Sequence, residues 1–312
     1  MHTLICGSMA YDTIMVFPDQ FKNHILPEQI HILNVAFLVP QMRREYGGCA
    51  GNIAYNMKLL GGHPLIMATV GDDFDPYATR LDRLEISRAH IRHVPNSFTG
   101  QAFITTDLDD NQITAFHPGA MNFSERNQVG DAQDVTLGIV SPDGRDGMLQ
   151  HAQQFQAAGI PFVFDPGQGM PMFSGEELLQ FVDQATYVTV NDYEAKLLQD
   201  KTGQSIEQLA QRVKALIVTL GAQGSAIYTD GKQIEIPTPT PTEVLDPTGC
   251  GDAYRAGLLH GIQQGWDWET TGRLASLLGS IKIASRGGQN HTPSREELGV
   301  QFKQHFGYSI EL

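Results

Sequence analysis

Short apolar runs alternate along the second half of the chain with longer segments whose apolar residues recur at helical spacing. The apolar runs predict strands at 135–140, 160–164, 187–190, 216–220, 225–229 and 233–236. The longer segments predict helices at 148–158, 176–185, 192–199, 251–264 and 268–285. This alternation favours a doubly wound α/β fold, in which helices cover both faces of a mostly parallel sheet.

The first third of the chain is less regular. It predicts a strand at 4–6 and a helix at 50–60, but the residues between them contain three prolines and no convincing long helix. Residues 98–116 alternate apolar and polar side chains and predict a hairpin that turns at Asp109-Asp110-Asn111. We therefore expect a small β-sheet lid inserted into an α/β domain. The expected lid comprises 11–44 and 96–118, and the expected α/β domain comprises 1–10, 45–95 and 119–312.

The balance of charge narrows the classes of function. The 312 residues include 35 Asp and Glu against 21 Lys and Arg, a formal net charge of −14. A chain this acidic, without a basic run, is not expected to bind nucleic acid or anionic lipid. Cys6, Cys49 and Cys250 are too scattered to predict a disulfide framework or a structural zinc site. With no signal-peptide pattern and no long apolar stretch, we expect a cytoplasmic protein.

The run at 246–252, Asp-Pro-Thr-Gly-Cys-Gly-Asp, stands where a long helix should begin. Gly249 and Gly251 flank Cys250 there, so main-chain N–H groups can converge on an anionic phosphoryl group, helped by the helix dipole. Asp252 in the first turn could accept a proton from an attacking hydroxyl group. An ordinary helix N-cap accounts for the same spacing about equally well.

A second segment, 47–54, reads Gly-Gly-Cys-Ala-Gly-Asn-Ile-Ala and leads into the helix expected at 50–60. Glycines before a helix let a ligand approach the backbone closely. Asn52 offers both a hydrogen-bond donor and an acceptor. A plain loop–helix junction is the alternative interpretation.

A third segment places Asn191 and Glu194 three positions apart, directly after a predicted strand. They can share one face of the first helical turn, at the strand end that lines the ligand crevice of a parallel sheet. An amide and a carboxylate there could hold a hydrated Mg²⁺ ion. A capping Asn beside a solvated Glu would give the same pattern.

A fourth segment, 218–224, is a strand followed by a Gly-x-x-Gly turn that could admit the phosphates or ribose of a nucleotide. By itself this pattern is not specific. The chain has no Walker A motif and no protein-kinase signature set.

In order and spacing, the four segments resemble the ribokinase (PfkB) family of carbohydrate and nucleoside kinases. The family's two signature regions correspond to 47–62 and 246–259, and the resemblance spans essentially the whole chain. Within the family the sequence is most similar to bacterial adenosine kinases of the mycobacterial type. Five short sequence segments carry this closer similarity, and they begin at Gly7, Ile25, Phe116, Asn191 and Asp246. Cys250 departs from the small aliphatic residue or glycine usual there, which could make activity sensitive to thiol reagents.

The resemblance implies a ribokinase-like fold and transfer of the γ-phosphoryl group of ATP, with Mg²⁺, to the 5′-hydroxyl group of adenosine. It implies that Asp252 is the catalytic base and that Gly249, Cys250 and Gly251 form the anion hole. The expected ATP-binding residues are Asn191, Thr219, Gly221, Gly224 and Gly251, and Asn191 and Glu194 would hold Mg²⁺ through water. The expected nucleoside-binding residues are Ser8, Asp12, Gly48, Asn52 and Asp252, with Phe37, Phe103, Phe116, Met121 and Gln168 around the base.

Several alternatives stay open. A family member that phosphorylates ribose, fructose or another sugar would share Asp252 but offer polar side chains from the lid. A catalytically silent nucleoside-binding protein would have no need of Asp252. A monovalent-cation site is also common in the family, and Asp246 with the loop 285–288 would supply its K⁺ ligands. An uncovered edge strand of the lid would suit a homodimer.

Overall fold

Two β-sheets organise the part of the chain that the computed structural model describes, residues 1–25, 34–109 and 111–312. The larger sheet has nine strands, which follow one another in space as β13 (Lys232–Ile236), β12 (Ser225–Thr229), β11 (Ala215–Thr219), β10 (Tyr187–Asn191), β9 (Phe162–Phe164), β8 (Val135–Val140), β1 (His2–Cys6), β4 (Pro64–Val70) and β5 (Ser87–His93). From β11 to β5 all neighbours are parallel, and β12 and β13 add an antiparallel hairpin.

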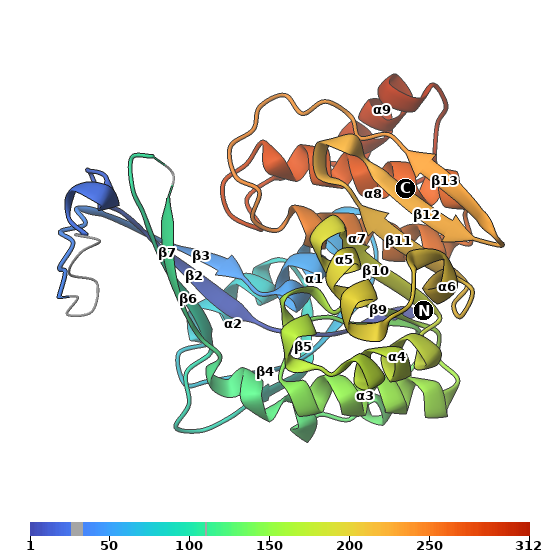
Figure 1. Ribbon diagram of the computed structural model, residues 1–312, viewed down its shortest axis with the longest axis horizontal. Coiled ribbons are helices and arrows are strands. Elements are labelled where there is room, and N and C mark those ends of the chain that lie inside the picture. The colour runs from blue at the N-terminus through green and yellow to red at the C-terminus, as the bar shows by residue number, and fades with distance from the viewer. Residues whose placement is uncertain (26–33, 110) are drawn as a thin grey trace.

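Helices cover both faces of the larger sheet (Figure 1). They are α1 (Cys49–Leu59), α2 (Asp75–Arg83), α3 (Arg145–Ala158), α4 (Gly175–Gln184), α5 (Asp192–Thr202), α6 (Ile206–Ala210), α7 (Cys250–Gln264), α8 (Trp268–Ile283) and α9 (Arg295–Phe306). Along β11, Leu216 and Val218 pack with α3 to α6, whereas Ile217 packs with α7 and α8. Such a strand is buried on both sides and reads as a continuous apolar run. The doubly wound α/β fold predicted from the sequence is confirmed.

The smaller sheet is the expected lid, and it projects from one side of the molecule (Figure 1). Its strands follow the order β3 (Gln41–Gly47), β2 (Ala10–Val16), β6 (Gly100–Thr106) and β7 (Gln112–His117). The predicted hairpin is β6–β7, and the Asp107 carboxylate accepts hydrogen bonds from the main-chain N–H groups of Asp109 and Asn111 in its turn. Asp110, in the middle of that turn, lies outside the described residues. So do Leu26, Pro27 and Glu28 of the run Ile25-Leu26-Pro27-Glu28. Below, these four strands are called the lid, and the larger sheet with α1–α9 is called the body.

Some elements differ from those that the sequence predicts. The sequence patterns did not indicate β4, β5, α2, α6 or α9. β5 reads Ser-Arg-Ala-His-Ile-Arg-His and is an edge strand whose residues are mostly exposed, so it shows no apolar run. Short 3₁₀ helices also connect the main elements, namely η1 (Phe21–Asn23), η3 (Gly119–Arg126), η4 (Val129–Asp131), η5 (Gly167–Met172) and η6 (Gly221–Gln223). None of the helices described is long and apolar enough to cross a membrane.

Candidate active site

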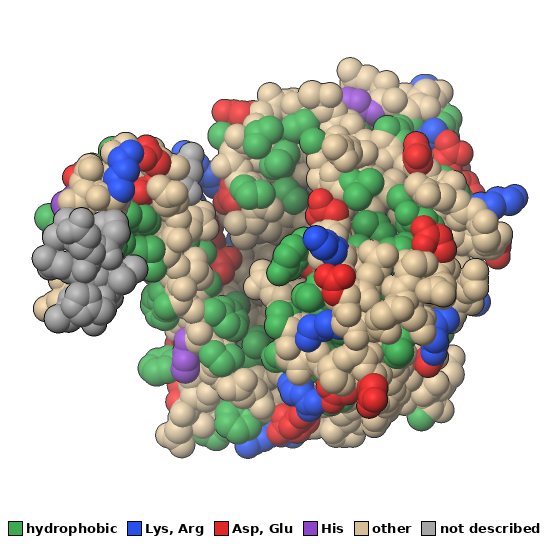
Figure 2. Space-filling view, viewed as in Figure 1, with side chains coloured by type: hydrophobic (Ala, Val, Ile, Leu, Met, Phe, Trp, Pro, Cys, Tyr) green, Lys and Arg blue, Asp and Glu red, His purple; other side chains and the backbone are tan. Residues whose placement is uncertain are grey.

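The carboxyl ends of the parallel strands and the lid enclose the candidate site. The chain passes from the carboxyl end of β1 almost directly into β2, so the lid stands beside this edge of the sheet. Asn191 and Thr219, the last residues of β10 and β11, are paired in register at the same edge. The space-filling view shows the surface hollowed between lid and body (Figure 2).

Asp252 lies in the first turn of α7, and Asn52 on α1 donates its side-chain N–H to Asp252 Oδ2 at 2.8 Å. Burial raises the pKa of Asp252 to about 6, while the Asn52 amide and the Arg255 guanidinium act in the opposite direction. A carboxylate with a pKa near the working pH can take up a proton and release it again, as a general base must.

The start of α7 has the form that an anion hole needs. Gly249 adopts φ 78°, a left-handed conformation, and a Cβ atom there would lie 3.0 Å from Gly288 Cα. Of the three residues predicted for the anion hole, Gly249 and Gly251 have no main-chain acceptor for their N–H groups among the described residues, and the same holds for Asp252, as is usual in a first turn. The N–H group of Cys250, by contrast, donates to the carbonyl oxygen of Pro247 at 3.2 Å. Cys250 directs its thiol to the Asp246 carbonyl oxygen, and burial raises the pKa of that thiol to about 11. A protonated, inward-facing thiol does not favour the predicted sensitivity to thiol reagents.

Asp12 brings a second carboxylate to the site from the lid. Burial raises its pKa to about 6, and the charges of Asp252, Asp246 and Glu45 add to this effect. Gly48 adopts φ 85°, and a Cβ atom there would lie 2.5 Å from the carbonyl oxygen of Ser8. The Ser8 hydroxyl oxygen in turn accepts the main-chain N–H of Cys49 at 3.2 Å. The structure thus brings together the residues that the sequence predicted for the sugar.

Asn191 and Glu194 form a reciprocal capping box at the start of α5. Asn191 Oδ1 accepts the main-chain N–H of Glu194 at 2.7 Å, and Glu194 Oε2 accepts that of Asn191 at 2.8 Å. Glu194 is buried rather than solvated, and its burial, with the charge of Asp165, raises its pKa. The described residues contain no group of three or more metal-ligating side chains. The arrangement fits Mg²⁺ that keeps most of its water and contacts one or two protein groups.

The segment expected at the nucleotide lies next to this pair. Thr219 is followed by a closed loop in which Leu220 donates its main-chain N–H to the carbonyl oxygen of Gly224 at 2.8 Å. Gly221 is exposed within the loop, and Thr219 is half-buried beside Asn191. The loop therefore presents backbone to the same edge of the sheet.

The aromatic residues expected around the base do not all face the site. In the lid Asp12 pairs with Ala102, which pairs with Phe116, so Phe116 shares the face of Asp12. Phe103 is the next residue along β6 and points to the opposite face, because successive side chains of a strand alternate. Phe37 packs against Phe17 and Phe21, with ring centroids 4.7 Å and 5.1 Å apart. Met121 is half-buried in η3, and Gln168 is exposed in η5. The structure thus leaves Phe116 on the face of Asp12 and places Phe103 on the opposite face.

A buried ion pair links α7 to the end of β9, and the sequence patterns did not indicate it. Arg255 donates two hydrogen bonds to the Asp165 carboxylate at 2.9 Å and 3.1 Å and lies 3.9 Å from Glu194 Oε2. It also donates to the Gly251 carbonyl oxygen at 3.3 Å. The available signal was an arginine within the mostly small and apolar run 253–259 of α7.

Gln289 orients Asn52, and no sequence motif pointed to it. Its side-chain N–H group donates to Asn52 Oδ1 at 3.1 Å and to the Tyr77 hydroxyl at 2.6 Å, while its Oε1 accepts from Arg80 at 3.2 Å. Since Asn52 Oδ1 is occupied in this way, its side-chain N–H group faces Asp252. Gln289 thereby fixes the amide that positions the carboxylate.

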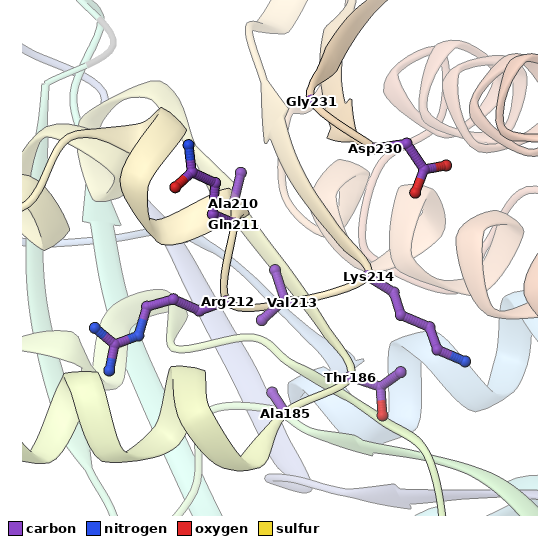
Figure 3. A pocket seen from close by; sticks show the side chains of 9 residues that line it. All are labelled: Ala185, Thr186, Ala210, Gln211, Arg212, Val213, Lys214, Asp230 and Gly231. Atoms are coloured by element: carbon purple, nitrogen blue, oxygen red, sulfur yellow. The ribbon is translucent and has the colours of Figure 1, made fainter.

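A surface depression of about 540 Å³ lies elsewhere, at the amino ends of β10 and β11 (Figure 3). Its lining comprises Ala185, Thr186, Ala210, Gln211, Arg212, Val213, Lys214, Asp230 and Gly231. The candidate site uses the carboxyl ends of these same strands, so the depression is not part of it.

Comparisons with known proteins agree with this geometry. The model of the pfkB family of carbohydrate kinases matches residues 10–295. A nucleoside kinase of Methanocaldococcus jannaschii is 34% identical over 277 residues, which cover 87% of this chain and 90% of that protein.

Solved structures extend the similarity. The structure of a Burkholderia thailandensis nucleoside kinase in complex with inosine matches with a TM-score of 0.90 and 53% identity, covering 98% of this chain and 99% of that one. The structure of that kinase in complex with ADP-inosine matches with a TM-score of 0.88 and 54% identity, covering 99% and 97%.

Proposed function

Since this chain belongs to the pfkB family of carbohydrate kinases, we propose that it transfers the γ-phosphoryl group of ATP to the 5′-hydroxyl group of a purine nucleoside. Its similarity to nucleoside kinases supports a nucleoside rather than a free sugar as the acceptor. The sequence predicts adenosine, and the inosine bound by the Burkholderia relative adds a second purine nucleoside to be tested. All three cysteines are free, which fits the reducing cytoplasm in which we place the reaction.

The observation that carries the proposal is the meeting of three groups between body and lid. Asp252 stands beside the unpaired N–H groups of the first turn of α7, and Asp12 faces it from the lid. A carboxylate has two acceptor oxygens, so Asp12 can hold the two adjacent hydroxyl groups of a ribose. The 5′-hydroxyl group would then lie toward Asp252.

The residues of this chain act mainly by positioning the two substrates and by stabilising the charge of the transferring group. Asp252 accepts the proton of the 5′-hydroxyl group as that oxygen bonds to phosphorus. The N–H groups of Gly251 and Asp252 hold the oxygens of the transferring group. Asn191 and Glu194 would hold Mg²⁺ through water, and the ion supplies charge neutralisation on the phosphates. Closure of the lid excludes water, which would otherwise compete as the acceptor.

The test measures ADP release with adenosine, inosine, guanosine, ribose and fructose at equal concentrations. We expect turnover with at least one purine nucleoside at a kcat/KM well above that of either sugar. A preference for ribose or fructose would identify a sugar kinase. Tight nucleoside binding without any ADP release would identify a silent binding protein.

We also propose that two copies associate through their lids. β7 is an edge strand of the lid, and all of its residues are exposed. An uncovered edge strand offers unpaired N–H and C=O groups to a second copy. Sedimentation velocity is expected to show a dimer, and a monomer at micromolar concentration would contradict this proposal.

A further inference from the structure

Lys282, in the last turn of α8, is completely buried, with 0% of its surface exposed. Lysine is almost never fully buried unless it is paired. Its Nζ atom donates to the main-chain oxygen of Asp246 at 2.8 Å and to that of Ser285 at 2.9 Å. No carboxylate oxygen of the described residues lies within 4.0 Å of it. The ammonium group is therefore held by backbone carbonyl oxygens, which is how proteins often hold a bare cation.

These oxygens belong to the residues that the sequence predicted to hold K⁺, Asp246 and the loop 285–288. The Asp246 carboxylate is also engaged, since it accepts the main-chain N–H groups of Thr248 at 2.9 Å and Gly287 at 2.8 Å. A potassium ion on the two carbonyl oxygens would stand next to the ammonium group, and two like charges at such a distance in a buried place repel strongly. The residues present do not fit K⁺.

The ammonium group occupies a position that matters for the anion hole. It joins the segment before α7, at Asp246, to the segment after α8, at Ser285. Gly288 in the second segment packs against Gly249, where α7 begins. The charge is also close enough to Cys250 to oppose the rise in the pKa of its thiol that burial causes. A fixed positive charge thus supports the helix start that would receive the phosphoryl group.

We propose that Lys282 is a built-in cation: its ammonium group replaces the monovalent cation beside the anion hole, so this chain needs no potassium. The proposal uses the kinase activity only for its rate measurements. Hydrogen bonds from a charged donor are stronger than neutral ones, so a covalently attached ammonium group can hold both segments without exchange with solvent.

The first experiment uses the unaltered protein. Its kcat is measured in potassium chloride and in N-methyl-D-glucamine chloride at equal ionic strength, and we expect values within about twofold of each other. Its Tm, measured without substrate, is expected to be the same in both salts. A kcat several times higher in potassium, or a Tm that rises with potassium alone, would overturn the proposal.

The second experiment uses Lys282→Met, which removes the charged nitrogen and shortens the side chain by that one atom, so that the two oxygens lose their donor. In N-methyl-D-glucamine we expect kcat to fall about 10-fold or more, by analogy with other electrostatic supports of a transferring group. Potassium is expected to restore part of the loss and to raise the Tm of the variant, because it can occupy the vacated oxygens. Normal kcat in the variant without potassium, or a loss that potassium leaves unchanged, would refute the role.

Lys201→Met is the matched control. Lys201 on α5 also donates to two main-chain oxygens, those of Pro171 at 3.4 Å and Phe173 at 2.6 Å, but these are remote from α7. We expect its kcat to stay normal and its Tm not to respond to potassium. If Lys282→Met fails to fold, the measurements on the unaltered protein still decide the question. If no acceptor is phosphorylated, the proposed function fails, whereas the Tm measurements still test the cation site.

Discussion

The body and the lid contribute to the same site in different ways. On the body, the polar groups are tied to one another: Asp252 to Asn52, Asn52 to Gln289, and Arg255 to Asp165. On the lid, the exposed side chains of β7 include Phe116, with 51% of its surface accessible. The difference teaches that the body holds its charged groups in place through hydrogen bonds, whereas the lid leaves side chains exposed; in the proposed reaction these would contact the acceptor and close over it.

The largest expected effect comes from the carboxylate on the body. Asp252→Asn keeps the shape of the side chain but removes the base, and we expect kcat to fall at least about 100-fold with little change in KM. Asp12→Asn on the lid should instead raise KM for the nucleoside more than it lowers kcat. Initial rates over a range of nucleoside concentrations separate the two.

Asp200→Asn serves as the control for both variants. Asp200 is an exposed carboxylate on α5, and its replacement should leave kcat and KM unchanged. Near-normal kcat in Asp252→Asn would remove Asp252 from the role of base.

The second prediction concerns stability. Arg255→Met leaves the buried Asp165 carboxylate without its partner, and we expect the free energy of unfolding to fall by about 3–5 kcal/mol. Lys22→Met, in η1 next to the lid, breaks an exposed ion pair with Asp109 in the lid hairpin turn, whose N–O distance is 3.1 Å, and should cost less than about 1 kcal/mol. Urea unfolding followed by circular dichroism measures both. Equal losses would show that the body is no more dependent on its ion pair than the lid.

Sequence reasoning was informative about the body where chemistry and local spacing coincide. Asp252 and Gly249 lie in one short run, and the α/β alternation follows from apolar periodicity, so both could be predicted. The partners of these residues could not. Gln289 and Asn52 are 237 positions apart, and Arg255 and Asp165 are 90 apart, so only tertiary packing brings them together.

The lid exposes a different limit of prediction. The alternation of apolar and polar residues predicts a hairpin at 98–116. It does not predict which side chains face the site, because that depends on the pairing register, and a shift of one residue exchanges the two faces of a strand. Alternation alone therefore does not show that Phe103 and Phe116 lie on opposite faces of the lid, as they do in the structure. No sequence pattern singled out Lys282, because its burial depends on how α8 packs against the segment that contains Asp246.

The third prediction uses this difference between two lid aromatics. Phe116→Ala removes a ring from the face of Asp12, and the loss of stacking on a purine, about 1–3 kcal/mol, should lower kcat/KM roughly 5- to 150-fold through KM. Phe103→Ala removes a similarly exposed ring from the opposite face and should change kcat/KM little. Steady-state kinetics with adenosine and inosine provide the measurement. A larger effect at Phe103 would place the base on the other face of the lid.

The last expected effect is a pH dependence to which both the body and the lid contribute. Burial raises the pKa of both Asp12 and Asp252 to about 6, so lowering the pH below 6 protonates groups that act as carboxylates. We expect kcat/KM to fall at least about tenfold per pH unit there, with a shallower slope in Asp12→Asn because one titrating group is gone. The protonation of ATP affects the unaltered protein and Asp12→Asn equally, so the difference between their slopes measures the contribution of Asp12 protonation.

Stability should respond with the opposite sign. A carboxyl group whose folded-state pKa is raised binds its proton more tightly in the folded state than in the unfolded state. The stability that these two groups contribute is therefore fully present below about pH 4, near their unfolded pKa, and is lost as the pH rises through 6. Asp12→Asn should accordingly flatten the dependence of Tm on pH over this range, while the fall in activity at low pH persists through Asp252. If activity and Tm instead decline together as the pH is lowered from 7 to 5, unfolding rather than protonation of the site would explain the loss, and the lid and body carboxylates would not form the pair argued for above.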